Sequence, residues 1–227
     1  MPIHLQREID NLKKEILNLS AMAEMSVREA VTSIQERDGA LAKHIIENDA
    51  RIDRKEVDVE ETCLKILALY QPVATDLRFI VAVLKINTDL ERIADLAVNI
   101  AERAVYIATQ PEVDLAFDFP GMSSKAETML KESLDALVNL DADLAYKVCA
   151  DDDVVDAMNR QAYGQIQDAL HKHPDQTECL IHLLSVSRHL ERIADGATNI
   201  AEDVIYMVRG EIVRHKVEEY KSRKHNN

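Results

Sequence analysis

The sequence predicts an all-α protein made of two tandem, pseudo-symmetric three-helix bundles. Hydrophobic residues make up 47% of the 227 positions, which is enough to bury a core. The five glycines and five prolines are too few for the many tight turns of an all-β fold. They fall mainly where the helical periodicity of apolar residues breaks, and the pattern between the breaks occurs twice along the chain.

The breaks delimit six helices. They are expected over about 5–36, 40–69, 75–108, 122–139, 142–172 and 176–210. The second helix stops before Pro72, because the residue preceding a proline is disfavoured in a helix, and Thr75 can cap the third. We therefore divide the chain into a first bundle (1–110), a connecting segment (111–121), a second bundle (122–215) and a C-terminal tail (216–227).

An internal duplication supports this division. The sequence Leu-Glu-Arg-Ile-Ala-Asp at 90–95 recurs at 190–195, and 13 of the 23 positions in 84–106 are identical in 184–206. A weaker repeat relates 38–53 to 141–156, at an offset of 103 instead of 100. Each half is therefore expected to fold as one three-helix unit.

Acidic residues recur at helical spacing within the repeat. Residues four apart share a helix face, so each helix of the two hairpins presents a pair of carboxylates. If the two helices of each hairpin are antiparallel, the two carboxylate pairs of the first half lie at the same height along the hairpin, which turns at Pro72. The two pairs of the second half do the same about a turn at Pro174. The eight residues are Asp49, Asp53, Glu91, Asp95, Asp152, Asp156, Glu191 and Asp195.

Two interpretations of these carboxylates are open. Four like charges in one patch are costly unless they are solvated, protonated or neutralised, and a hard cation such as Mg²⁺, Ca²⁺, Mn²⁺ or iron suits oxygen ligands. Alternatively, the acids form a solvated outer face with ordinary ion pairs. Asn99 and Asn199, one turn further along, are candidate additional ligands. Arg92 and Arg192 are expected to pair with carboxylates or to fix the hairpin rather than to bind phosphate.

Composition excludes several classes of function. The formal charge of −14 argues against a nucleic-acid partner, because nucleic-acid affinity depends on cations. The N-terminus does not resemble a signal peptide and no apolar stretch is long enough to span a bilayer, so a cytoplasmic protein is expected. Glu-x-x-His, phosphate-binding-loop and nucleophile-elbow motifs are absent, so no catalysis is expected.

Three cysteines, Cys63, Cys149 and Cys179, are widely spaced within the predicted helices. An odd number without Cys-x-x-Cys spacing predicts buried, reduced thiols rather than disulfides or a metal site.

The motifs resemble those of the PhoU family of phosphate-signalling regulators. The resemblance rests on Leu-Glu-Arg-Ile-Ala-Asp with a following Asn in both halves, on Gln-Pro-Val-Ala-Thr-Asp-Leu-Arg at 71–78 and on Asp-x-x-x-Asp at 49–53. It implies two three-helix bundles, often self-associating, that bind multinuclear metal clusters through the eight carboxylates. The metal would be divalent or trivalent, with iron, Zn, Mn and Mg as candidates. The second half departs from the pattern, since it lacks the Pro-x-x-x-Asp-Leu-Arg signature at Pro174, so a role of Arg78 would be confined to the first half.

The resemblance also implies a function. It predicts a non-catalytic negative regulator of phosphate uptake and of the phosphate-starvation two-component response. The partners would be a phosphate-sensing histidine kinase, the ATPase of the phosphate ABC transporter and a second copy of the chain in a homodimer. The chain would reach the membrane only through these partners. A metal-buffering or cluster-dependent redox protein and a metal-free helical scaffold are the alternatives.

Overall fold

The computed structural model describes residues 3–113 and 118–213, and in these ranges it contains six α-helices and no strand. The helices are α1 (Ile3–Gln35), α2 (Gly39–Tyr70), α3 (Ala74–Ile107), α4 (Phe119–Asn139), α5 (Ala142–Lys172) and α6 (Thr177–Arg209), with a 3₁₀ turn, η1 (Pro174–Gln176), before α6. The predicted all-α fold with two repeated three-helix units is confirmed. The predicted tail at 216–227 lies outside the described residues.

The largest error in the predicted boundaries is at the start of α4. The expected start was 122, but the helix begins at Phe119. Asp118 caps it by accepting a hydrogen bond from the backbone N–H of Gly121 at 2.9 Å. Pro120 fits in the first turn because its missing N–H has no intrahelical partner there. Residues 119–121 of the expected connecting segment (111–121) thus form the first turn of α4, and 114–117 lie outside the described residues. The division into domains stays a prediction.

Equivalent aspartates cap α2 and α5, and they account for the weaker sequence repeat. Asp38 accepts hydrogen bonds from the backbone N–H groups of Ala40 and Leu41, both at 2.9 Å. Asp141, at the offset of 103, does the same for the first turn of α5. Each cap satisfies two N–H groups that lack an intrahelical partner, so the two halves begin their acidic helices in the same way.

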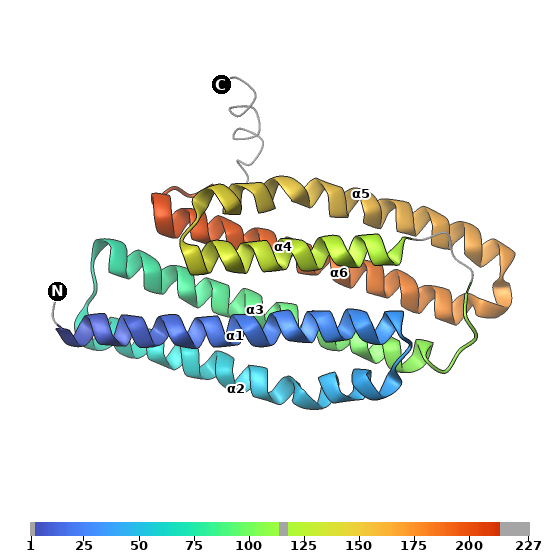
Figure 1. Cartoon of the computed structure of the whole chain (residues 1–227), viewed down its shortest axis with the longest axis horizontal. Coiled ribbons are helices and arrows are strands. Elements are labelled where there is room, and N and C mark those ends of the chain that lie inside the picture. Colours follow the sequence, from blue (N-terminus) through green and yellow to red (C-terminus); the bar gives the residue numbers. More distant parts are fainter. Residues whose placement is uncertain (1–2, 114–117, 214–227) are drawn as a thin grey trace, which may run out of the picture.

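α3 and α6 form the centre of the molecule (Figure 1). α1 and α2 pack on α3, α4 and α5 pack on α6, and α1 also contacts α4. α3 and α6 are antiparallel, since Lys85 near the start of α3 contacts Asp203 near the end of α6, and Tyr106 at the other end of α3 contacts His182. The helices that carry the repeated motifs are thus brought together across the boundary between the halves.

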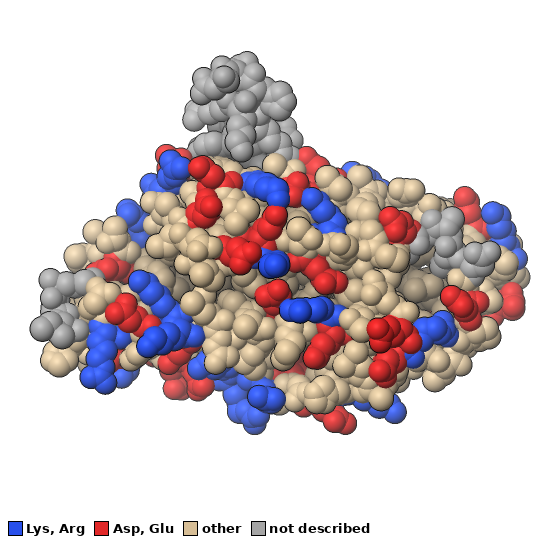
Figure 2. All heavy atoms as spheres, in the orientation of Figure 1, with Lys and Arg blue, Asp and Glu red and all other residues tan. Residues whose placement is uncertain are grey.

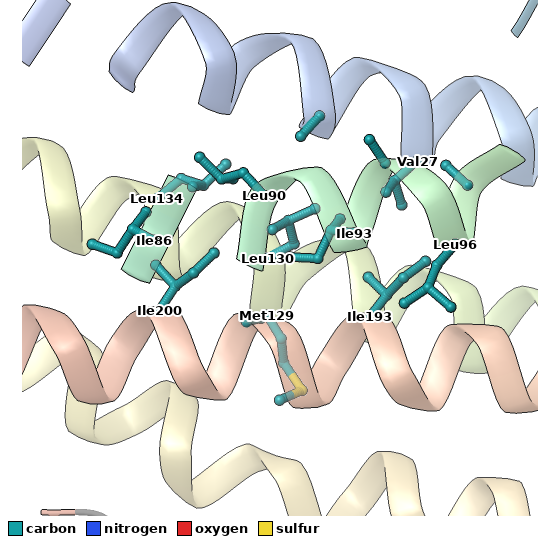
Figure 3. Close-up of a cluster of buried hydrophobic side chains, with 14 of the residues drawn as sticks. Val27, Ile86, Leu90, Ile93, Leu96, Met129, Leu130, Leu134, Ile193 and Ile200 are labelled. Atoms are coloured by element: carbon teal, nitrogen blue, oxygen red, sulfur yellow. The ribbon is translucent and has the colours of Figure 1, made fainter. Parts of the chain in front are cut away.

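One hydrophobic core extends through both halves. α1 contributes a stripe at intervals of three or four residues that begins with Leu5, Ile9, Leu12 and Ile16. At the centre, Ile86, Leu90 and Ile93 of α3 lie next to Ile193 and Ile200 of α6 (Figure 3). The two repeated units therefore share their buried surface rather than enclosing separate cores.

The contact between α3 and α6 is close because one of its residues is glycine. A Cβ at Gly196 would lie 2.9 Å from Cγ1 and Cδ1 of Ile93. The repeat places Leu96 at the equivalent position of α3, where it is buried against the same core. The duplication is therefore asymmetric at the helix crossing.

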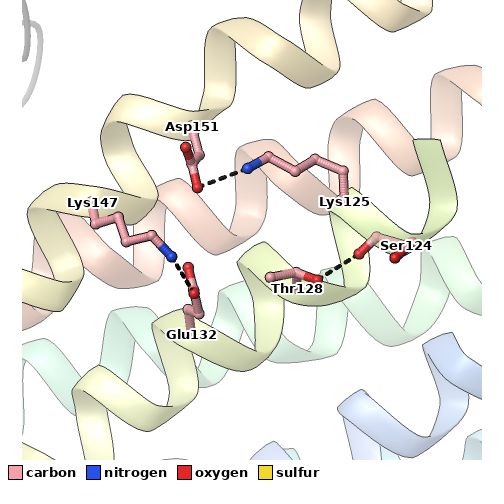
Figure 4. A network of polar contacts seen from close by, with 6 residues as sticks. All are labelled: Ser124, Lys125, Thr128, Glu132, Lys147 and Asp151. Carbon is pink, nitrogen blue, oxygen red and sulfur yellow. Dashed lines mark hydrogen bonds and ion pairs between the residues drawn. The ribbon is translucent and has the colours of Figure 1, made fainter. Parts of the chain in front are cut away.

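Two ion pairs hold α5 against α4 (Figure 4). Lys125 of α4 contacts Asp151 of α5 at 2.8 Å, and Lys147 of α5 pairs with Glu132 of α4. Successive helical residues point in directions about 100° apart, so Asp151 faces α4 while Asp152 is directed toward α6. These contacts set the rotation of the helix that carries Asp152 and Asp156.

The three cysteines are buried and free, as predicted. Burial raises the pKa of the Cys63 thiol to about 12, so it stays protonated and unreactive. Acidic and basic side chains are intermixed on the face shown in Figure 2. None of the helices in the described part of the chain combines the length and apolar character needed to cross a bilayer.

Candidate metal centre

Three of the predicted carboxylates converge between α5 and α6. One carboxylate oxygen from each of Asp156, Glu191 and Asp195 lies within 4.8 Å of the other two. Asp156 and Glu191 are half-buried and Asp195 is exposed. Across residues 3–113 and 118–213 this is the one group of three His, Cys, Asp or Glu residues that meets this separation.

Asp152, the fourth predicted residue of this half, lies beside the three. Its Oδ1 accepts a hydrogen bond from the Thr198 hydroxyl at 3.3 Å. Burial, and then the charges of Asp195 and Asp156, raise its pKa to about 6, although the Thr198 bond opposes the shift. The ionised form of Asp152 is therefore destabilised in the metal-free protein.

The same causes act on two of the converging residues, Glu191 and Asp195. Burial and then the Asp156 charge raise the pKa of Glu191. Although Asp195 is exposed as a residue, the protein around its carboxylate partly desolvates it, and this effect, followed by the Glu191 and Asp156 charges, raises its pKa. Arg192 lowers both pKa values, and Arg92 reaches across from the first half to lower that of Asp195. The carboxylates are thus only partly compensated by protein cations.

The equivalent residues of α2 and α3 are close enough to interact but are less tightly gathered. Burial and then the charges of Asp53 and Asp95 raise the pKa of Asp49. Burial and the Asp53 charge raise the pKa of Asp95. Burial and then the Asp95 charge raise the pKa of Glu91, with smaller contributions from the other acids of the cluster. Within the described chain, Asp49 Oδ1 is buried without a hydrogen-bond partner. The register predicted about Pro72 agrees with these interactions.

The two asparagines differ in their surroundings. Asn99 donates a hydrogen bond from Nδ2 to the Asp95 carbonyl one turn earlier, at 2.8 Å. Asn199 is exposed and donates from Nδ2 to Asp89 Oδ1 of the other half, at 3.3 Å. Both leave the amide oxygen for another partner, and their role as ligands stays a prediction.

Three polar residues near the carboxylates were not predicted. The charge of Glu56 helps to raise the pKa of Glu91, and Glu56 accepts a 2.8 Å hydrogen bond from buried Asn87. Thr198 donates a hydrogen bond to Asp152, and Asp89 accepts one from Asn199. Glu56 lies seven residues after Asp49, so its helical spacing was a usable signal. The repeat did not point to Glu56, because its equivalent in the second half is Asn159 and not an acid.

A pocket of about 510 Å³ opens beside the second-half carboxylates. Its lining combines both halves: Asp89, Arg92 and Ile93 from α3, Asp152 from α5, and Arg192, Asp195, Gly196, Thr198, Asn199 and Glu202 from α6. Of the predicted carboxylates only Asp152 and Asp195 line it. The pocket gives solvent and small solutes access to the second-half site.

These residues fit a metal ion of the kind predicted. All donors are carboxylate oxygens, which hard cations prefer, and three already lie close enough to share one ion. The raised pKa values and the buried Asp49 oxygen without a partner are costs that a bound cation would relieve. Asp156, Glu191 and Asp195 would hold the ion in the second half, with Asp152 next to it.

Comparison with known proteins identifies the family. The model of the PhoU domain matches residues 16–104 and 119–204, one copy in each half. The chain belongs to the PhoU family. Both Leu-Glu-Arg-Ile-Ala-Asp motifs and all eight candidate carboxylates lie inside the matched segments.

Full-length relatives share the PhoU match. The chain is 36% identical over 212 residues to a phosphate-specific transport system accessory protein PhoU homolog of Aquifex aeolicus, covering 93% of this chain and 96% of that protein. It is 33% identical to the homolog of Clostridium acetobutylicum, covering 92% and 95%.

Solved PhoU structures share the fold. The crystal structure of PhoU from Pseudomonas aeruginosa superimposes with a TM-score of 0.88 at 34% identity, covering 91% of this chain and 99% of that one. The phosphate transport system regulatory protein PhoU from Streptococcus pneumoniae gives 0.81 at 27% identity, with 92% and 99% covered. The expected PhoU family and fold are both confirmed.

Proposed function

We propose that this PhoU-family chain is a non-catalytic regulator of phosphate homeostasis that binds metal through its acidic hairpins. It would negatively regulate phosphate uptake and the phosphate-starvation two-component response. Family membership supports a role in the phosphate system, since the relatives are accessory proteins of phosphate-specific transport. The observation that carries the metal-binding part is the convergence of Asp156, Glu191 and Asp195 oxygens within 4.8 Å.

The partners follow from this role. The chain would contact a phosphate-sensing histidine kinase and the ATPase of a phosphate ABC transporter on the cytoplasmic side of the membrane, and would associate as a homodimer. The relatives' description as transport-system accessory proteins supports an association with the transporter. The absence of a membrane-spanning helix from the described residues is compatible with attachment through these partners.

The metal would act on the hairpin geometry. A divalent or trivalent ion, with iron, Mn, Zn and Mg as candidates, supplies positive charge between α5 and α6. Asp156, Glu191 and Asp195 would hold this ion and would then stay ionised, and their shared contact with it would fix the spacing of the two helices. The related carboxylates on α2 and α3 would hold a second site. Metal loading would therefore change the rigidity and charge of surfaces that partners contact.

Gene replacement tests the regulatory role. Deleting the gene should raise expression of a phosphate-starvation reporter at high phosphate, and the wild-type gene should restore repression. An Asp156→Asn, Asp195→Asn double variant should restore it less well at equal protein level. A control double variant, Asp135→Asn with Asp168→Asn, removes two exposed charges away from the cluster and should restore repression fully. Unchanged reporter expression in the deletion strain would overturn the proposal.

A further inference from the structure

Arg92 and Arg192 occupy equivalent positions of the repeat and line the same pocket. They were expected to pair with carboxylates or to fix the hairpin rather than to bind phosphate. In the described part of the structure, however, neither guanidinium lies within 4 Å of a carboxylate or forms a hydrogen bond. Both still act on Asp195 from a distance, since each lowers its pKa. Two strongly basic groups thus face a pocket of about 510 Å³ with their donors uncommitted.

The pocket lies where the repeat is broken at one position. Gly196, which lines the pocket and packs on Ile93, is replaced in the first half by Leu96, whose side chain is 2% exposed. Arg92 comes from the first half but lines the pocket beside the second-half carboxylates Asp152 and Asp195. Both repeated arginines therefore serve the second-half cluster.

The charge balance decides what the pocket can hold. The carboxylates of Asp152 and Asp195 line the pocket beside the two arginines, and their negative charge weakens the attraction of the metal-free pocket for an anion. A cation on Asp156, Glu191 and Asp195 neutralises part of that charge next to the arginines. Anion and cation binding at this place should therefore be coupled.

We propose that this pocket binds a small tetrahedral oxyanion of the phosphate type when the α5–α6 cluster holds its cation. Arg92 and Arg192 are the principal donors, because a guanidinium presents paired N–H groups that match such an anion. Asn199 can add its second amide hydrogen, since one is directed to Asp89. Because both arginines line this one pocket, we expect one anion in it per chain. The inference rests on the proposed metal site.

Calorimetry on the purified full-length chain tests it. The protein is loaded with Mn²⁺, freed of unbound metal and titrated with inorganic phosphate, with sulfate as a second tetrahedral anion. We expect one phosphate per chain, and about tenfold or more weaker binding after metal removal. An Arg92→Gln, Arg192→Gln variant should retain its Mn²⁺ but bind phosphate about tenfold or more weakly, since hydrogen bonds to charged groups contribute at least this much.

A matched control removes the same charge elsewhere. Arg7→Gln with Arg28→Gln, two exposed positions of α1, should leave phosphate binding unchanged. The anion site would be overturned if Mn²⁺-loaded wild-type protein does not bind phosphate. It would also be overturned if phosphate binding is unchanged by the Arg92 and Arg192 substitutions or by removal of the metal. Neither result would contradict the metal site. Failure of the wild-type chain to hold Mn²⁺ would overturn both.

Discussion

Lys85 of α3 forms a 3.0 Å ion pair with Asp203 of α6, an aspartate whose side chain is only 3% exposed. The ammonium group also lies 5.2 Å from the centre of the Tyr206 ring. This contact joins the two halves at one end of their central helix pair. A buried carboxylate that loses its cation is costly, whereas a solvated one is not.

Lys85→Met should therefore destabilise the protein by about 1–3 kcal/mol, since it removes the ammonium group that contacts the buried Asp203 carboxylate. Urea unfolding followed by circular dichroism measures this change. Lys65→Met is the control, because Lys65 and Glu8 form a more exposed surface pair at 3.6 Å whose loss should cost well under about 1 kcal/mol. Equal effects of the two substitutions would contradict the structural role of the Lys85 contact.

Gly196→Ala should destabilise the chain by about 1–3 kcal/mol, because the added methyl group meets the Ile93 side chain at 2.9 Å in the helix crossing. Gly164→Ala on α5 provides an opposite control. A Cβ there meets no atom within 4 Å, so the better helix propensity of alanine should stabilise the protein by about 0.5–1 kcal/mol. Thermal unfolding distinguishes the two, and a stabilising effect at Gly196 would show that the crossing is looser than described.

The pKa of Asp152 predicts a pH dependence. The folded value of about 6 lies above the ordinary value of 3.8, so the folded protein binds the extra proton. The contribution of Asp152 to stability is intact below about pH 4 and is lost as the pH rises through about 6. Asp152→Asn cannot titrate. In metal-free protein, the free energy of unfolding of this variant should match that of wild type near pH 4 and exceed it by about 1–2 kcal/mol at neutral pH.

Chemical denaturation at several pH values in the presence of a chelator measures this difference. For Asp168→Asn, an exposed substitution on the same helix, the difference in unfolding free energy from wild type should not increase with pH. A constant difference between wild type and Asp152→Asn from pH 4 to pH 7 would contradict the burial and charge repulsion assigned to this carboxylate.

Much of the architecture could be predicted from local signals. Asp38 and Asp141 are helix caps, prolines mark the hairpins, and residues spaced by four share a helix face, so the helices and the register of Asp49 with Asp95 follow from short-range rules. The PhoU motifs then identified the family that the comparisons confirm.

What escaped prediction depends on contacts between the halves. Nothing local distinguishes Lys85 from a solvated lysine, and its partner Asp203 lies 118 residues away. The asymmetry also escaped, because the repeat suggested two equal clusters. The closer gathering of Asp156, Glu191 and Asp195, and the pocket beside Gly196, arise from side-chain packing across α3, α5 and α6.

Metal analysis of the purified chain tests whether the acidic hairpins bind metal. Wild-type protein saturated with Mn²⁺ or iron and then desalted should retain stoichiometric metal, measured by plasma mass spectrometry. Asp156→Asn with Asp195→Asn removes two of the three converging oxygens, and this variant should lose the second-half metal while remaining folded. The control Asp135→Asn with Asp168→Asn should hold as much metal as wild type. Equal trace metal in all three proteins would contradict the account and leave the carboxylates as a solvated acidic face.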